Sequence, residues 1–142
     1  MFNNVTFNTA EHWMMAKKAL LFDDSISFQK IIKANSPSEA KQLGRNVVNF
    51  DQKIWDQHKF EIVVKGNFLK FTHNKELQDF LLGTNDNILV EANPYDRIWG
   101  IGLNENSPNV KNPLRWRGLN LLGFALMEVR DIIKNRINQK NQ

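Results

Sequence analysis

The sequence predicts a predominantly helical α+β fold with a few short strands. Two patterns support this prediction: apolar residues recur every three or four positions over long stretches, and short apolar runs lie between turn-forming residues. The chain has 142 residues, of which 42% are hydrophobic, so it can bury one core. We expect residues 1–142 to form a single domain, with about 138–142 as a frayed polar tail.

Helix-capping signals place the elements of the first third of the chain. Thr9 is positioned to cap one helix, and the Ser-Pro-Ser-Glu sequence at 36–39 forms a capping box for another, which should end near Gly44. In chain order, this part is expected to contain a strand at 5–7 and helices at 10–21, 25–34 and 37–43.

The remaining elements follow from apolar spacing and from turn residues. Asp51 opens a long amphipathic segment, in which Gly66 permits close packing, and Asn74 and Gly83 bracket a shorter helix. Residues 104–113 are rich in Asn, Pro and Ser, which is typical of an exposed loop. The expected elements are helices at 52–72 and 75–82, strands at 88–91 and 99–103, and a last helix at about 118–136.

Composition excludes several classes of protein. Cysteine is absent, so thiolate chemistry and a disulfide scaffold are excluded, and a reducing cytoplasmic setting is expected. We expect no membrane span and no secretion signal, because the apolar runs are too short and the first residues lack a basic segment. The three histidines are scattered and no HExxH, Walker or GxGxxG motif is present, so no metal site is expected. The net charge of +4 suits an anionic ligand but is also ordinary for a globular protein.

Charged residues suggest two places for chemistry in the first third of the chain. Glu11 and Lys18 are seven residues apart, so they lie two turns apart on one helix face, about 10 Å along the axis. They are candidates for acid–base or covalent catalysis. Alternatively, Glu11 only interacts favourably with the helix dipole and Lys18 is only a solvated surface residue. Arg45, beside Gly44, is a candidate for binding phosphate, or for donating hydrogen bonds to the carbonyls at a helix end.

Aromatic residues mark two further candidates. Trp55 is either a core residue or a stacking platform for a planar base. Residues 91–100 combine Glu91, Asp96, Tyr95 and Trp99 in a turn between the two later predicted strands. A loop has little structural need for this combination, so here we favour function.

Together these segments resemble the NADAR family, also called YbiA-like proteins. They occur in the family's order over nearly the whole chain, and AEHWMMAKKA and WGIGL are the specific pieces. The matching segments are Thr9–Ala19, Gly44–Arg45, Trp55, Leu89–Glu91, Asp96, Trp99–Leu103, Gly118–Gly123 and Leu126–Arg130.

The resemblance implies an N-glycosidase that cleaves a ribose C1–nitrogen bond without metal or organic cofactor. Its substrates would be ribosylamino-pyrimidine phosphates, which are early riboflavin intermediates, or ADP-ribose conjugates, including ADP-ribosylated guanine in nucleic acid. It implies essential roles for Glu11, Trp55 and Asp96, and a covalent role for Lys18 in a Schiff base with the opened ribose. The expected substrate-binding residues are Trp55 for the base, Arg45 for phosphate, Glu91, Trp99 and Gly100 for the pocket wall, and Asn120 for a hydrogen bond.

Two alternatives belong to other functional classes. The first is a module that binds ADP-ribose or a nucleotide without turnover. The chain begins almost at the strand expected at 5–7, whereas family members usually carry more residues before it, so a more open pocket or altered activity is expected. The second is a basic nucleic-acid-binding domain, but the 19 Lys and Arg residues are spread out among acidic ones.

Overall fold

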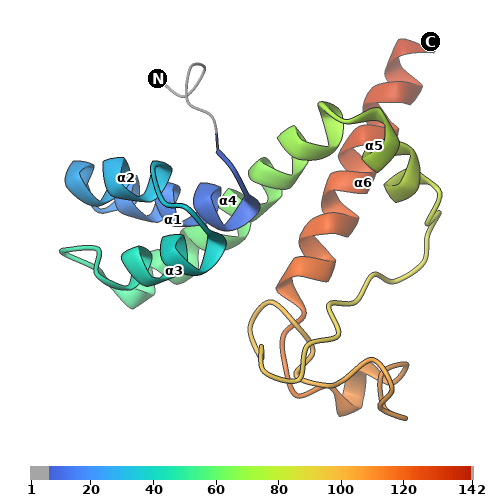
Figure 1. Ribbon diagram of the computed structural model, residues 1–142. Helices are drawn as coiled ribbons and strands as arrows, with labels where there is room; N and C mark the ends of the chain where they lie inside the picture. The colour runs from blue at the N-terminus through green and yellow to red at the C-terminus, as the bar shows by residue number, and fades with distance from the viewer. Residues whose placement is uncertain (1–6, 142) are drawn as a thin grey trace. The chain divides into compact units, whose positions relative to one another are not determined.

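The computed structural model describes residues 7–141, and most of them are helical (Figure 1). The chain divides into two compact units, Met1–Gly66 and Asn67–Gln142, which are described separately below. The helices of the described range are α1 (Ala10–Leu21), α2 (Ser25–Ile32), α3 (Pro37–Arg45), α4 (Gln52–Thr72), α5 (Lys75–Leu82) and α6 (Leu121–Lys140), with a short 3-10 helix, η2 (Pro113–Arg115).

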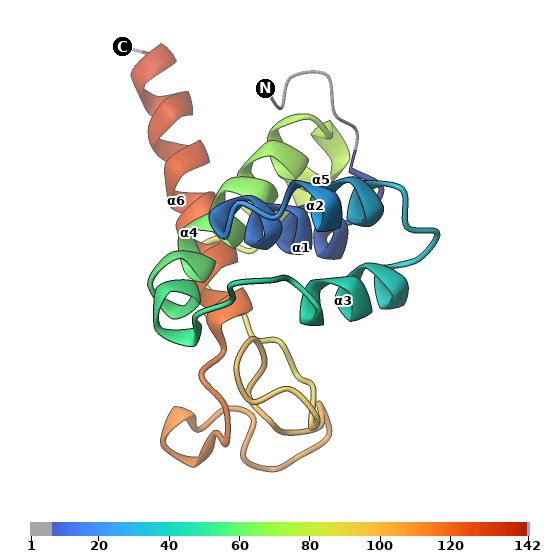
Figure 2. The same ribbon diagram turned by 90° about the vertical axis from the view of Figure 1, so that its left-hand side faces the viewer.

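The first unit is built around α1, which packs against both α2 and α3 (Figures 1 and 2). The contacts combine buried alanines with larger apolar side chains, which together fill the core. The core contains Met15, Ala16, Ala19, Phe22, Phe28, Ile31, Ala34, Ala40, Val47 and Trp55.

Two glycines of this unit lie in close contact with side chains of α1. A Cβ on Gly66 would lie 2.5 Å from the indole of Trp13, whose Nε1 donates to the Ile62 carbonyl at 2.8 Å. A Cβ on Gly44 would lie 2.1 Å from the sulfur of Met15. The close packing expected at Gly66 is therefore confirmed, and α3 ends at Arg45, the residue after Gly44, near which its end was expected.

The predicted capping signals are confirmed. Thr9 accepts from the His12 amide, Ser36 from the Glu39 amide, and Asn74 from the Leu77 amide. Asp51 accepts from the amides of Lys53 and Ile54 and so opens α4. Each cap satisfies donors that the first helical turn leaves unpaired, which explains why α1, α4 and α5 begin where the sequence indicated.

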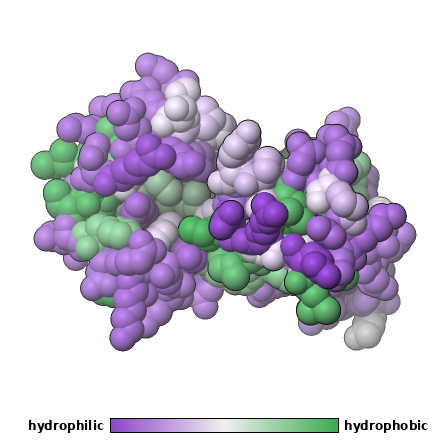
Figure 3. Space-filling view, turned by 90° about the horizontal axis from the view of Figure 1, so that it is seen from below, coloured by the Kyte–Doolittle hydropathy of each residue, from purple (hydrophilic) through white to green (hydrophobic). Residues whose placement is uncertain are grey.

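In the second unit, α5 packs against α6. The segment between these two helices contains none of the expected strands. Arg130 on α6 is only 4% exposed, and its Nη1 donates to Thr84 Oγ1 and to the Asn87 carbonyl, both at 2.9 Å. These bonds attach the segment that follows α5 to helix α6. On the face shown in Figure 3, apolar residues form small patches within a mainly hydrophilic surface. None of the helices described is long and apolar enough to cross a membrane.

The strands predicted at 88–91 and 99–103 are wrong, and residues 7–141 contain no strand. The two segments share a single backbone hydrogen bond, from the Ile101 amide to the Glu91 carbonyl. Their other partners are the Asn120 side chain and backbone groups of 117–122, so no ladder forms between them. The strand predicted at 5–7 falls mainly outside the described residues, and Phe7 is not in a strand. The described fold is therefore predominantly α-helical and not α+β.

Three helices have ends that differ from the prediction. The second helix stops at Ile32, two residues early, and α3 continues to Arg45. The last helix begins at Leu121 and runs to Lys140, so its final turns include residues expected in the polar tail. Its late start has a physical cause, because Asn120 adopts a left-handed conformation (φ 53°) that a helix excludes.

Candidate active site

The first unit brings Lys18 together with three other predicted residues and with one aromatic residue that the sequence analysis missed. The Nζ of Lys18 lies 4.5 Å from the ring centroid of Phe50 and 5.6 Å from that of Trp55. Arg45 and Glu11 both act electrostatically on this amine. An ammonium held over aromatic faces is stabilised in a fixed position, which gives the side chain a defined orientation.

The surroundings of Lys18 lower its pKa below that of an exposed lysine. Burial lowers the pKa of Lys18, the positive charge of Arg45 lowers it further, and the negative charge of Glu11 raises it. A neutral amine is a nucleophile and an ammonium is not, so a lowered pKa increases the reactive fraction near neutral pH. The site therefore has the features of an activated lysine beside a carboxylate.

We expect neutralising the two neighbours to move the pKa of Lys18 in opposite directions. Arg45→Gln removes a repulsive positive charge, so the pKa of Lys18 should rise; Glu11→Gln removes an attractive negative charge, so it should fall. NMR titration of the lysine Cε and Hε signals measures both changes. Lys17 is the internal control, because its pKa is lowered by burial and by Lys65. Equal displacement of both lysines would contradict a local effect.

Trp55 is 8% exposed and belongs to the core of the first unit. Most of its ring is therefore packed inside the unit, and one of its contacts is with the Lys18 amine. This placement leaves little ring surface for stacking on a base. Trp55 contacts the Lys18 amine from within the core, and its stacking on a base stays a prediction.

Phe50 was missed although a sequence signal existed. Asp51 caps α4, so Phe50 immediately precedes the cap and Trp55 is the fourth helical residue. Apolar residues at these two positions commonly pair as a hydrophobic staple. Both rings contact the same amine, and Phe22 also packs against Phe50, with centroids 5.3 Å apart.

The start of α1, which carries Glu11, is fixed by its buried neighbour His12. This imidazole is 1% exposed; its Nδ1 lies 2.6 Å from Thr9 Oγ1, and its Nε2 lies 2.9 Å from the Ala34 carbonyl. Both ring nitrogens are thus occupied within the protein. His12 joins the beginning of α1 to the end of α2 and has a structural role.

In the second unit, Asp96 organises the loop over residues 91–100. Its Oδ1 accepts from the amides of Ile98, at 3.0 Å, and Trp99, at 2.8 Å. Asp96 and Trp99 are half-buried, whereas Tyr95 between Pro94 and Asp96 is 94% exposed. Oδ2 of Asp96 has no hydrogen-bond partner among residues 7–141.

Backbone contacts hold this loop against the start of α6. The amides of Leu121 and Leu122 donate to the carbonyls of Ile98 and Trp99, which satisfies the first turn of α6 in place of a side-chain cap. Gly100 is required here, because a Cβ would lie 2.9 Å from the carbonyl oxygens of Glu91 and Asp96. The loop and α6 therefore form one connected element within the second unit.

Asn120 completes this connection. It is fully buried; its Oδ1 accepts from the Glu91 amide at 2.9 Å, and its Nδ2 donates to the Leu89 carbonyl at 3.0 Å. Its amide group is thus engaged inside the protein. Asn120 positions Glu91, which is itself half-buried.

We expect Asn120→Ala to lower the free energy of unfolding by about 3 kcal/mol, from two lost hydrogen bonds and a strained left-handed backbone. Asn120→Gly loses the same bonds but tolerates the positive φ, so it should cost about 1 kcal/mol less. Urea unfolding of the two variants measures the difference. Equal destabilisation would show that backbone strain at this position is negligible.

The structure thus groups the predicted residues by unit. Within the first unit, Glu11, Lys18, Arg45 and Trp55 share one neighbourhood. Within the second unit, hydrogen bonds and close approaches link Glu91, Asp96, Trp99, Gly100 and Asn120. Arg45 is exposed at the last position of α3 and not beyond the helix end. The described residues include no group of three or more His, Asp or Glu side chains that would hold a metal ion.

Comparison with known proteins gives consistent matches over most of the chain. The NADAR domain matches residues 1–134. The chain is 48% identical over 124 residues to "N-glycosidase R617" of Acanthamoeba polyphaga mimivirus, covering 87% of this chain and 72% of that protein. It is 32% identical over 135 residues to "Riboflavin biosynthesis protein PYRR, chloroplastic" of Zea mays, covering 90% of this chain and 20% of that protein. The NMR structure of the E. coli protein YbiA is similar with a TM-score of 0.76 and 30% identity, over 94% of this chain and 71% of that one.

Proposed function

The chain belongs to the NADAR family of N-glycosidases, and we propose that it hydrolyses the bond between C1 of a phosphorylated ribose and a nitrogen. The observation that carries this proposal is the placement of the Lys18 amine over the rings of Phe50 and Trp55, within the electrostatic influence of Glu11 and Arg45. An activated amine, a carboxylate and a guanidinium are suited to attack at an electrophilic carbon, proton transfer and phosphate binding.

The proposed reaction has two stages. The neutral amine of Lys18 attacks C1 and forms a C–N bond, while the bond from C1 to the leaving nitrogen breaks with its electron pair. The Glu11 carboxylate takes a proton from the attacking amine and passes it to the leaving nitrogen. The ribosyl-lysine opens to a Schiff base. Water then adds to C1, the C1–lysine bond breaks, and the free sugar phosphate leaves, so the net change is hydrolysis.

We assign Asp96 the role of stabilising positive charge. Cleavage of a ribosyl–nitrogen bond builds positive charge on C1 and the ring oxygen, and a carboxylate lowers the energy of that state. This role rests on the family resemblance and on the chemistry of the residue. The second carboxylate oxygen of Asp96, which has no partner among residues 7–141, is consistent with it.

Ribosylamino-pyrimidine phosphates are the leading substrate class, and the likeness to a riboflavin biosynthesis protein supports this choice. ADP-ribose conjugates are the second class. The side chains of Tyr95 and Arg97, both exposed on either side of Asp96, favour this second class, because an aromatic ring and a cation suit a further base and phosphate. In both classes we propose Arg45 as a phosphate-binding residue and Glu91, Trp99 and Gly100 as substrate-binding residues.

A mass-spectrometric turnover assay tests the proposal. Purified protein is mixed with a ribosylaminopyrimidine 5′-phosphate and, separately, with an ADP-ribosylated guanine oligonucleotide. Release of ribose phosphate or of ADP-ribose, respectively, identifies the substrate class. Binding of both compounds without any release would overturn the proposal and favour a module that holds ADP-ribose or a nucleotide without turnover.

A further inference from the structure

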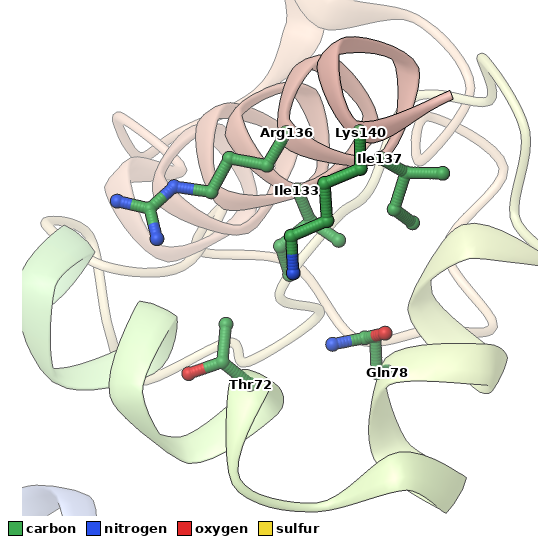
Figure 4. A pocket seen from close by; sticks show the side chains of 6 residues that line it. All are labelled: Thr72, Gln78, Ile133, Arg136, Ile137 and Lys140. Atoms are coloured by element: carbon green, nitrogen blue, oxygen red, sulfur yellow. The ribbon is translucent and has the colours of Figure 1, made fainter. Parts of the chain in front are cut away.

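The second unit contains a small cavity that is lined by the last residue of α4, by α5 and by the second half of α6. Its volume is about 230 Å³, and it is lined by Thr72, Gln78, Ile133, Arg136, Ile137 and Lys140 (Figure 4). Drug-sized ligands usually occupy cavities of roughly 300–1,000 Å³, so this one suits a smaller molecule. None of its residues belongs to the site proposed above.

The charges that line this cavity are unbalanced. Arg136 and Lys140 are one helical turn apart on α6, and no carboxylate lines the cavity. Neither cation forms an ion pair with a residue in the range 7–141. Two like charges at this spacing repel each other, and an anion bound between them would relieve that repulsion.

Contacts within the unit orient the polar groups. The guanidinium of Arg136 lies over the Phe68 ring, 4.5 Å from its centroid, which holds its plane while leaving its edge N–H groups for an acceptor. Lys140 extends from α6 toward the side of the cavity where Thr72 and Gln78 lie (Figure 4). The Nε2 of Gln78 donates to the Phe71 carbonyl at 3.4 Å, so the amide is fixed to α4.

The cavity also has an apolar side. Ile133 is 3% exposed and Ile137 is 39% exposed, and both line it. A fully hydrated anion gains little from such a surface, whereas an anion with an apolar or planar body would bury that body against it.

We propose that this cavity is a second ligand site, which binds a phosphate monoester through Arg136 and Lys140 and packs its organic group on Ile133 and Ile137. The proposal goes beyond the N-glycosidase function and does not depend on it. Arg136 would engage two phosphate oxygens with its planar fork, and Lys140 would act as a point charge.

NMR titration with phenyl phosphate, and separately with inorganic phosphate, tests the site directly. The signals followed are the backbone amides of Thr72 and Gln78 and the side-chain amide of Gln78. We expect saturable shifts with both probes, and phenyl phosphate should bind at least about threefold more tightly because of its apolar ring. No saturable shift at these residues with either probe would overturn the proposal.

Charge-matched variants separate this site from general attraction to a basic protein. Arg136→Gln and Lys140→Gln should each weaken phenyl phosphate binding by about tenfold. Lys134→Gln removes the same charge from the same helix, but the Nζ of Lys134 is engaged with the Asn85 carbonyl and Asp86 Oδ1. It should change binding less than about twofold. Equal weakening by Lys134→Gln would overturn the proposal, and an unchanged affinity in Lys18→Met would show that the readout is independent of the active site.

Discussion

Replacing Lys18 with methionine is expected to abolish turnover while the protein stays folded. Methionine keeps most of the length and apolar stem of the side chain, so its packing on Phe50 and Trp55 should largely survive. It removes the amine whose pKa is lowered by burial and by Arg45, and that can attack in its neutral form. We expect the rate to fall by at least about a thousandfold, because nucleophiles that act with an acid–base partner have effects of this order.

Lys17→Met is the matched control. Lys17 is the next residue on α1, its pKa is also lowered by burial, and its Nζ lies 4.7 Å from the Trp13 ring. The second influence on its pKa is Lys65, whereas Lys18 is affected by Arg45 and Glu11. The Lys17 variant should therefore keep nearly full activity.

A chemical trap distinguishes a covalent role from a purely electrostatic one. Borohydride reduces a Schiff base, so treatment during turnover should fix the sugar phosphate to Lys18, and peptide mass spectrometry would locate it. Lys18→Arg keeps the positive charge but has no nucleophilic amine, so it should be inactive and untrapped. A fully active Lys18→Arg protein, or an adduct only at another lysine, would show that Lys18 is not the nucleophile.

The helices were predictable because their signals are local. Capping side chains and apolar spacing define α1, α4 and α5 within a few residues along the chain, and the structure places them at the predicted bounds. The segments 88–91 and 99–103 have apolar runs typical of strands, yet their hydrogen-bond partners include Asn120, Arg117 and Leu122. Those partners lie far along the chain, so no short pattern reveals them.

The sequence indicated which residues belong to the candidate site better than it indicated how they are arranged. Spacing indicated that Glu11 and Lys18 share a helix face, and both are now found to interact. The sequence left Trp55 open between a core position and a stacking platform, and the structure places it in the core. Nothing in the sequence showed that both atoms of the Asn120 amide are engaged inside the protein. These properties depend on which side chains surround a residue, and that information is absent from its own neighbourhood in the sequence.

Replacing Asp96 with asparagine is expected to lower turnover by about a hundredfold to a thousandfold with little loss of stability. The side-chain oxygen of asparagine can accept the same bonds from the Ile98 and Trp99 amides, so the loop should keep its shape. Only the negative charge is lost, and with it the stabilisation of positive charge on the ribose. Steady-state kinetics and thermal unfolding of the same sample measure the two effects separately.

Comparison with Asp96→Ala separates the effect of the carboxylate charge on turnover from the effect of the hydrogen bonds that hold the loop. Alanine loses the charge and both accepted hydrogen bonds, so it should lower the free energy of unfolding by about 1–2 kcal/mol as well as the rate. If the loop shape alone mattered, asparagine would be fully active and alanine would not. If the charge matters as proposed, the two variants lose activity to a similar degree and differ in stability, because both lack the carboxylate and only alanine releases the amides of Ile98 and Trp99.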